Sequence, residues 1–306
     1  MSSKSQSIQI PTCPIEPLIH QESVQLDMLR EDLNHPLIQG NKFRKLKYNL
    51  IKAKEMGCDT LLTFGGAFSN HIHATAAAGK AFGFKTIGYI RGEELAEKPL
   101  NVTLWEAKTF GMDFQFINRS LYREKNDESF LTQLRLKHPN AYILPEGGTN
   151  DLAVKGCEEI LDERTKYYDY ICLPVGTAGT IAGVIRSSQL NQTILGFPAL
   201  KNANFLKKEI AQFTPKMNYD FINAYHFGGY AKFSAELIMF VNDFYHKFQI
   251  PLDPIYNAKM LYGITTMIKE GYFPNGSRVL AIHTGGLQGI RGFNEMNDKQ
   301  IKVNNI

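Results

Sequence analysis

The sequence YICLPVGTAGTIAGVI occupies residues 170–185 and holds an apolar run, a glycine turn and a second apolar run in immediate succession. The first run, from Tyr170 to Val175, has the length and composition of a buried β-strand. Gly176 ends this strand, and the residues from Ile181 onward read as a helix. A continuous apolar strand followed by a helix is typical of a parallel sheet that is covered on both faces. This stretch therefore predicts an α/β fold.

The same pattern of strand and glycine turn occurs at three other places, residues 60–66, 85–92 and 279–286. Between the strands, the spacing of apolar residues predicts helices over residues 43–56, 70–82 and 98–110. We therefore expect open, twisted, mostly parallel sheets that are flanked by helices.

Length and charge narrow the class of protein. The 306 residues are 43% hydrophobic, which is enough for a large core in one large or two modest domains. The 34 basic and 30 acidic residues leave a formal net charge of only +4. The densest basic segment, residues 42–47, alternates with aromatic and aliphatic residues and is typical of a solvated helix face. We therefore expect no nucleic-acid partner.

The cysteines and the first residues of the chain bear on metal binding and compartment. No Cys-x-x-Cys pair or His/Cys metal spacing occurs among Cys13, Cys58, Cys157 and Cys172, so neither a disulfide framework nor a metal site is expected. Residues 1–10 lack the apolar stretch of a signal peptide, and no window approaches the roughly 18 apolar residues of a membrane span. We expect a cytoplasmic protein with no membrane partner.

Open α/β sheets bind ligands beyond the carboxyl ends of their strands, so the glycine turns there are the first candidates for a site. The turn after residue 175 comprises Gly176, Thr177, Ala178, Gly179 and Thr180. Backbone N–H groups at a helix N-terminus, with the threonine hydroxyls, would hold a phosphate. A tight turn without a ligand is the alternative. The spacing matches neither the GxGxxG dinucleotide fingerprint nor a Walker loop.

Two other turns and one lysine carry chemistry. The turn GGAFSNH at residues 65–71 places a hydroxyl, an amide and an imidazole at a helix start, where serine and asparagine are also ordinary caps. The turn HTGG at residues 283–286 ends the last strand, and His283 alone is more often a hydrogen-bonded core residue than a catalytic base. Lys42 follows a glycine and an asparagine, and taken alone it reads as a surface lysine.

Taken together and in this order, these segments resemble one group within the tryptophan-synthase-β-like, or fold type II, pyridoxal-phosphate enzymes. The group contains 1-aminocyclopropane-1-carboxylate deaminase and D-cysteine desulfhydrase. The resemblance rests on five separated motifs, from LREDL at residues 29–33 to HTGG at residues 283–286.

The resemblance implies how the chain divides into two lobes. A smaller α/β lobe would span residues 46–148 and carry the Ser-Asn-His turn. A larger lobe, which binds pyridoxal phosphate, would comprise residues 1–45 and 149–306. The turn-rich sequence PEGGTN at residues 145–150 would lead from one lobe to the other.

The resemblance also implies the cofactor, pyridoxal 5′-phosphate, and the residues that hold it. The segment GNKFRK at residues 40–45 matches the lysine segment of the family, so Lys42 would form a Schiff base with the cofactor and act in catalysis. Asn70 would approach the phenolate oxygen of the cofactor, and the loop from Gly176 to Thr180 would bind its phosphate. Either Asn257 or Thr284 would meet its pyridine nitrogen.

The substrate-binding residues follow from the same matches. Ser69 would lie near the substrate and act in catalysis, with His71 beside it. Tyr256, in the segment DPIY, would face the substrate and also act in catalysis, and Tyr230 matches a second active-site tyrosine. No residue here predicts the oligomeric state, and a homodimer is expected only by analogy with the fold.

These matches imply a lyase or deaminase of a small amino acid, with Lys42 as general base at the α-carbon. D-Cysteine would lose its α-proton and β-substituent and give pyruvate, ammonia and sulfide. The alternative substrate, 1-aminocyclopropane-1-carboxylate, would give 2-oxobutanoate and ammonia, and because it has no α-proton its ring must open differently.

Three positions favour the desulfhydrase. Asn257 stands where the cyclopropane deaminase has a glutamate and the desulfhydrase a threonine, and a neutral amide cannot hold a pyridinium proton as a carboxylate can. Thr284 agrees with the desulfhydrase pattern, and His73 replaces an arginine that could clamp a carboxylate.

Two other classes of function compete with this interpretation. A nicotinamide-dependent dehydrogenase would need the missing GxGxxG turn. A non-catalytic ligand-binding module on the same fold would have no need of Lys42.

Overall fold

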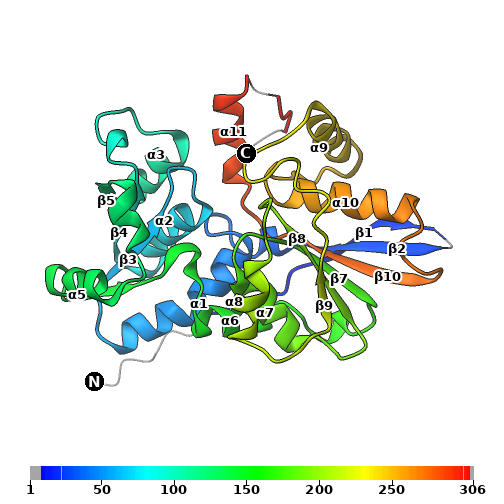
Figure 1. The fold of residues 1–306 in the computed structure, drawn as a ribbon, viewed down its shortest axis with the longest axis horizontal. Helices are drawn as coiled ribbons and strands as arrows, with labels where there is room; N and C mark the ends of the chain where they lie inside the picture. Colours follow the sequence, from blue (N-terminus) through cyan, green and yellow to red (C-terminus); the bar gives the residue numbers. More distant parts are fainter. Residues whose placement is uncertain (1–7, 22, 299, 304–306) are drawn as a thin grey trace.

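The computed structural model describes residues 8–21, 23–298 and 300–303 and contains two β-sheets (Figure 1). The larger sheet has six strands in the order β1-β2-β10-β7-β8-β9, and the smaller has four in the order β5-β4-β3-β6. All neighbouring strands are parallel except β1 and β2. The larger sheet comprises β1 (Ile15–His20), β2 (Val24–Leu29), β7 (Tyr170–Val175), β8 (Thr193–Pro198), β9 (Tyr219–Phe221) and β10 (Ser277–Ile282). The smaller comprises β3 (Thr60–Gly65), β4 (Lys85–Arg91), β5 (Met112–Ile117) and β6 (Ala141–Ile143).

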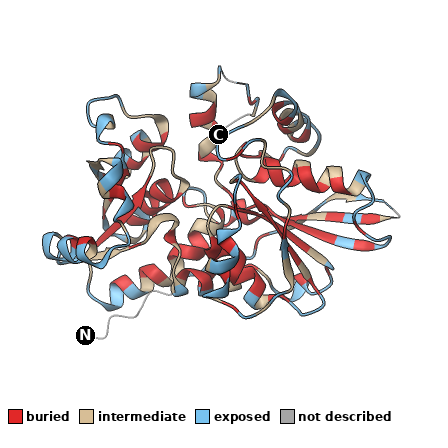
Figure 2. Ribbon diagram, in the orientation of Figure 1, coloured by how far each residue is buried: buried red, intermediate tan, exposed pale blue. Residues whose placement is uncertain are grey.

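Helices cover both faces of each sheet, and Figure 2 shows the buried residues along the strands and the inner helix faces. The larger sheet has α9 (Ala235–Phe248), α10 (Asn257–Lys269) and α11 (Gln288–Met296) on one face and α6 (Asp151–Glu158), α7 (Ala178–Ser187) and α8 (Phe205–Ala211) on the other. The smaller sheet packs against α1 (Gly40–Glu55), α2 (Asn70–Phe82) and α3 (Val102–Thr109) on one face and α4 (Arg119–Arg123) and α5 (Glu128–Lys137) on the other. The predicted α/β fold with mostly parallel sheets is confirmed.

The predicted helix over residues 98–110 begins too early. In the structure α3 begins at Val102, because Asn101 adopts an extended backbone and its side chain accepts a hydrogen bond from the N–H of Leu104. Pro99 also lacks the backbone N–H that a helix interior needs. The helix predicted over residues 70–82 has those bounds in the structure.

We propose the lobe boundaries given by the sequence, residues 46–148 for the smaller lobe and 1–45 with 149–306 for the larger. Their support is that every strand of the smaller sheet falls within residues 46–148. The first boundary cuts α1, which packs on α6 of the larger lobe and on α2 of the smaller. The helix that carries Lys42 therefore spans the junction of the two lobes.

The close packing of α1 on α6 depends on a glycine. A Cβ atom at Gly156 would lie 2.0 Å from the backbone oxygen of Arg44, a distance at which one helix must move. Helices that approach this closely tolerate no added side chain without strain.

Gly156→Ala is therefore expected to destabilise the protein by about 1–3 kcal/mol, because α1 and α6 must separate. The measurement is the free energy of unfolding in urea. Lys155→Ala, an exposed position on the same helix, is the control and should change the value by less than about 1 kcal/mol. Equal effects of the two substitutions would contradict the packing argument.

Candidate functional site

Lys42 is positioned by the backbone turn that precedes it. Gly40 has φ +61°, and a Cβ atom there would lie 1.9 Å from the backbone oxygen of Thr284. The buried side chain of Asn34 holds both sides of Gly40, since it accepts from the N–H at 2.8 Å and donates to the C=O at 2.9 Å. The N–H of Asn41 donates to Thr284 O at 3.2 Å. The start of α1 is thus fixed against the carboxyl end of β10.

Buried ion pairs hold the segment next to this turn. Glu31 receives two hydrogen bonds from the guanidinium of Arg44, at 2.8 and 2.7 Å, and one from Asn34 at 3.1 Å. Arg30 donates to both oxygens of Asp32 at 2.9 and 2.8 Å. The segment LREDL therefore orients the helix that carries Lys42.

The amine of Lys42 lies in a recess between the lobes. The side chain is half-buried, and Nζ donates to Asn41 Oδ1 at 3.2 Å. Asn70, Gly286 and Gln288 line the same recess. Burial lowers the pKa of Lys42 from its usual 10.5 to about 8. A sizeable fraction of the amine is therefore neutral, and nucleophilic, near neutral pH.

The glycine-threonine turn leaves the N-terminus of α7 open to an anion. Thr177 is the N-cap residue, but its side chain makes no capping hydrogen bond. Its Oγ1 instead pairs with Thr149 Oγ1 at 3.0 Å. Thr180 Oγ1 accepts from Asn41 Nδ2 at 2.8 Å and so ties the turn to the neighbour of Lys42. The first N–H groups of α7 are therefore of the kind that can bind an anion.

Lys45 is a second lysine at this turn, which the sequence reasoning did not single out. Its side chain is 1% exposed, and Nζ donates to Gly147 O at 2.7 Å, Thr149 Oγ1 at 2.9 Å and Thr177 Oγ1 at 3.1 Å. Among the described residues it has no carboxylate partner. Burial, and then the charge of Lys42, lower the pKa of Lys45 to about 7. Its position three residues after Lys42, on the same helix face, was the available signal.

The Ser-Asn-His turn lies across the recess at the start of α2. Ser69 Oγ caps the helix, accepting from the N–H groups of His71 and Ile72 at 3.2 and 3.3 Å. Asn70 reaches the recess. His71 is buried, and its Nε2 pairs with Thr63 Oγ1 at 2.9 Å. Burial and the ammonium groups of the two lysines lower the pKa of His71 well below its usual value, so the imidazole is neutral.

The amide of Asn257 is fully engaged by protein groups. Its Nδ2 donates to Asp253 Oδ2 at 2.6 Å and to Gly285 O at 2.9 Å, and its Oδ1 accepts from the N–H of Thr284 at 2.9 Å. The hydroxyl of Thr284 is 3.4 Å from the same oxygen, a long contact that leaves it free to turn to another partner. Of the two residues expected at the pyridine nitrogen, only Thr284 has a group to offer.

Tyr256 lies beside the glycine-threonine turn, and Tyr230 packs against it. A Cβ atom at Gly176 would lie 3.0 Å from the ring of Tyr256, and the ring of Tyr230 meets that of Tyr256 edge-on at 6.2 Å between centroids. Burial raises the pKa of Tyr256 well above its usual value. The sequence did not point to Lys259. Its buried amine donates to the carbonyls of His226 and Gly229 at 2.9 and 2.8 Å and so holds the loop that carries Tyr230.

His283 is a core residue. Its Nε2 donates to Pro251 O at 2.8 Å, and its Nδ1 accepts from the N–H of Gly285 at 3.2 Å. Both ring nitrogens are thus occupied. Within the described ranges, no group of three or more His, Cys, Asp and Glu side chains could hold a metal ion, and no helix is long and apolar enough to cross a membrane.

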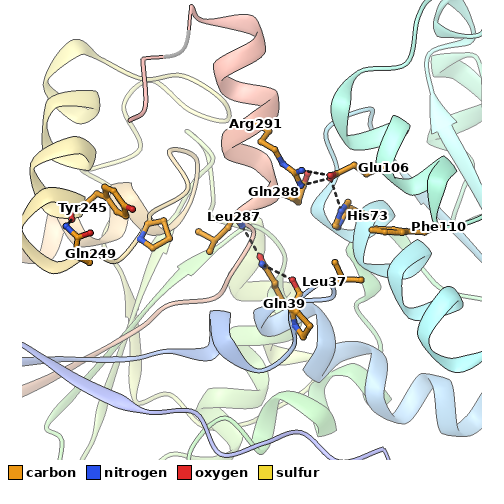
Figure 3. Close-up of a pocket in the computed structure, with 12 residues that line it drawn as sticks. Leu37, Gln39, His73, Glu106, Phe110, Tyr245, Gln249, Leu287, Gln288 and Arg291 are labelled. Carbon is orange, nitrogen blue, oxygen red and sulfur yellow. Dashed lines mark hydrogen bonds and ion pairs between the residues drawn. The ribbon is translucent and has the colours of Figure 1, made fainter. Parts of the chain in front are cut away.

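A cavity of about 360 Å³ adjoins the Lys42 recess between the lobes (Figure 3). Cavity and recess share Leu37, Gln39, His73 and Gln288. Glu106 pairs with His73 Nε2 at 3.2 Å and with Arg291 Nη2 at 2.7 Å, so polar side chains from α2, α3 and α11 meet on one wall. The cavity therefore borders the recess that Lys42 lines.

The chain matches one protein family over most of its length. The family described as "Pyridoxal-phosphate dependent enzyme" matches residues 7–285. A putative 1-aminocyclopropane-1-carboxylate deaminase of Pyrococcus abyssi is 30% identical over 294 residues, which cover 89% of this chain and 87% of that protein. A bifunctional D-cysteine desulfhydrase/1-aminocyclopropane-1-carboxylate deaminase, mitochondrial, of Arabidopsis thaliana is 28% identical, with 87% of this chain and 73% of that protein covered.

Solved structures share the fold. A structure described as an ACC deaminase homologue has a TM-score of 0.78 at 24% identity, with 95% of each chain covered. An O-acetylserine dependent cystathionine β-synthase of Helicobacter pylori has a TM-score of 0.64 at 16% identity, covering 93% of this chain and 95% of that one. From the family match and the relatives together, the chain belongs to the pyridoxal-phosphate dependent enzymes, in the group of 1-aminocyclopropane-1-carboxylate deaminase and D-cysteine desulfhydrase.

Proposed function

We propose that the protein is a D-cysteine desulfhydrase-like lyase that converts D-cysteine to pyruvate, ammonia and sulfide. The proposal rests on two residues of the site taken together. Lys42 has an amine with a lowered pKa, and the neutral residue Thr284 stands at the position expected for the pyridine nitrogen. The relatives support the group as a whole, and the choice of substrate within it rests on the residues of this chain.

The donor set fits pyridoxal phosphate. The uncapped N-terminus of α7 and the buried ammonium of Lys45, which has no carboxylate partner among the described residues, together suit a phosphate. Lys42 supplies a primary amine for the aldehyde. Asn70 Nδ2 and Thr284 Oγ1 supply neutral hydrogen-bond donors for the ring oxygen and the ring nitrogen. When bound, the cofactor withdraws the electrons left behind when a bond to the substrate α-carbon breaks.

We assign proton transfer at the substrate α-carbon to Lys42 Nζ. A base is most effective when its pKa lies near the working pH, and burial brings the pKa of Lys42 to about 8. Tyr256 stays protonated, because its pKa is held high, and would serve as a neutral hydrogen-bond donor to the substrate. Ser69, His71 and Tyr230 are proposed to complete the substrate site.

The surroundings of Asn257 favour D-cysteine over the cyclopropane substrate. Asp253 is the carboxylate that contacts Asn257. It accepts hydrogen bonds from the backbone N–H groups of Ile255, Tyr256 and Asn257 and from Asn257 Nδ2. Both of its oxygens are therefore engaged at the start of α10. A ring nitrogen that meets only a hydroxyl is a weaker electron sink, which suits removal of an α-proton better than ring opening.

1-Aminocyclopropane-1-carboxylate deaminase activity is the second candidate, because relatives of both names share the group. A non-catalytic binding module is disfavoured by the low-pKa amine of Lys42. A homodimer is proposed from the frequency of symmetric dimers alone.

Incubation of the cofactor-loaded protein with D-cysteine, L-cysteine, D-serine and 1-aminocyclopropane-1-carboxylate, in parallel, tests the substrate. We expect pyruvate from D-cysteine, and a loss of about 10²-fold or more in Lys42→Ala. 2-Oxobutanoate from the cyclopropane with no pyruvate from D-cysteine would overturn the preference in favour of the second candidate. Activity on none of the four, with the visible band of the cofactor present, would refute the choice of substrate and leave the cofactor proposal intact.

The pKa of Lys42 sets how fast the cofactor-free protein takes up pyridoxal phosphate. Only the neutral amine attacks the aldehyde, and at pH 7 an amine of pKa about 8 is about 10% neutral, against about 0.03% for an ordinary lysine. The rate at which the visible band forms should therefore rise with pH and level off above a midpoint near 8. A rate that keeps rising beyond pH 10 would contradict the lowered pKa.

Lys45→Met should weaken pyridoxal-phosphate binding by about 30-fold or more, since removing one partner of a buried charge pair costs about 2 kcal/mol or more. Equilibrium titration of the cofactor-free protein measures this. Lys47→Met, on the same helix but paired with Glu159, is the control and should change affinity less than about threefold. Equal losses in both variants would show that Lys45 does not face the phosphate.

A further inference from the structure

Gln288 joins the two lobes at the edge of the Lys42 recess. It is the first residue of α11 in the larger lobe and is 7% exposed. Its Nε2 donates to Asn70 Oδ1, at the start of α2 in the smaller lobe. Its Oε1 accepts from Thr103 Oγ1 on α3 at 3.0 Å. Figure 3 shows Gln288 on the wall of the interlobe cavity, and Gln288 also lines the recess.

The surroundings fix which end of the Asn70 amide faces which way. A Cβ atom at Gly289 would lie 3.6 Å from Asn70 Oδ1, so this oxygen sits at the first turn of α11. The N–H groups of a helix N-terminus carry a partial positive charge and favour an oxygen there. Both the helix and Gln288 Nε2 therefore hold Oδ1, and the NH₂ group is left on the opposite side.

The NH₂ group of Asn70 lies at the recess. A Cβ atom at Gly286 would be 2.6 Å from Asn70 Nδ2, so only a glycine leaves room for it there. Gly286, Asn70 and Lys42 line the same recess. No described residue accepts a hydrogen bond from Nδ2, and its hydrogens are available to a ligand held next to Lys42.

We propose that Gln288 is a positioning residue, which turns the Asn70 amide so that its NH₂ group donates to the ring oxygen of the cofactor. The inference rests on the proposed function, in which Lys42 holds pyridoxal phosphate. It adds a dependence on the lobes: Gln288 and Asn70 come from different lobes, so the donor is correctly turned only while the lobes are together as in this structure.

The test is the pH titration of the visible band of the cofactor-loaded protein, which does not require turnover. A donor to the ring oxygen stabilises its negative charge, so its loss should raise the titration midpoint by about one pH unit, as expected for a hydrogen bond to a charged group. Asn70→Ala and Gln288→Leu should each raise the midpoint. The double variant should shift it no further than Asn70→Ala alone, because the two residues act through one bond.

Gln288→Glu separates hydrogen bonding from packing. It keeps the size of the side chain and an oxygen for Thr103, but a carboxylate would draw the NH₂ group of Asn70 toward itself and away from the cofactor. Its shift should match or exceed that of Gln288→Leu. Arg291→Leu, which breaks the contact of α11 with Glu106 without touching Asn70, is the control and should leave the midpoint unchanged.

The outcomes separate this inference from the proposed function. A wild-type midpoint in both Gln288 variants, with a shift in Asn70→Ala, would overturn the role of Gln288 alone. No shift in Asn70→Ala would overturn it too, because Gln288 would have nothing to act through. If Lys42→Ala kept the band, the proposed function itself would fail.

Discussion

The site depends on the contact between the backbone of Gly40 and the carbonyl of Thr284. No side chain fits in this contact, and Asn34 holds the peptide groups of Gly40 from the other side. Buried ion pairs such as that between Glu31 and Arg44 add little net stability, but removal of one partner is costly. Their effect here is to allow a single geometry, in which the first turn of α1 carries Lys42 to the ends of the strands of the larger sheet.

A second constraint is positive charge that no carboxylate of the described residues pairs with. Lys42 and Lys45 lie on one face of α1, both with lowered pKa, beside the uncapped N-terminus of α7. In the cofactor-free protein this arrangement is unfavourable, since a buried charge loses its hydration. A bound phosphate would neutralise it. Unfavourable local arrangements of this kind are expected where a protein binds a ligand and not where it only needs to fold.

The sequence predicted the fold class and the strands β3, β4, β7 and β10, because apolar runs and glycine turns are local signals. It placed the start of α3 too early, because the capping by Asn101 outweighed the apolar spacing. The spacing of Lys45 after Lys42 was a signal, but the side-chain partners of Lys45 and Gln288 could not be predicted, since they lie more than 100 residues away in the sequence. The choice between Asn257 and Thr284 also stayed open, because only the folded chain shows that Asp253 and Gly285 already occupy the amide of Asn257.

The central claim is that Lys42, and not its neighbour Lys45, forms the bond to the cofactor. Reduction of the cofactor-loaded protein with borohydride makes that bond permanent, and mass spectrometry of a protease digest then locates the label. We expect one label per chain, on the peptide that contains Lys42 and at that residue. A label on Lys45, or labels spread over surface lysines, would contradict it.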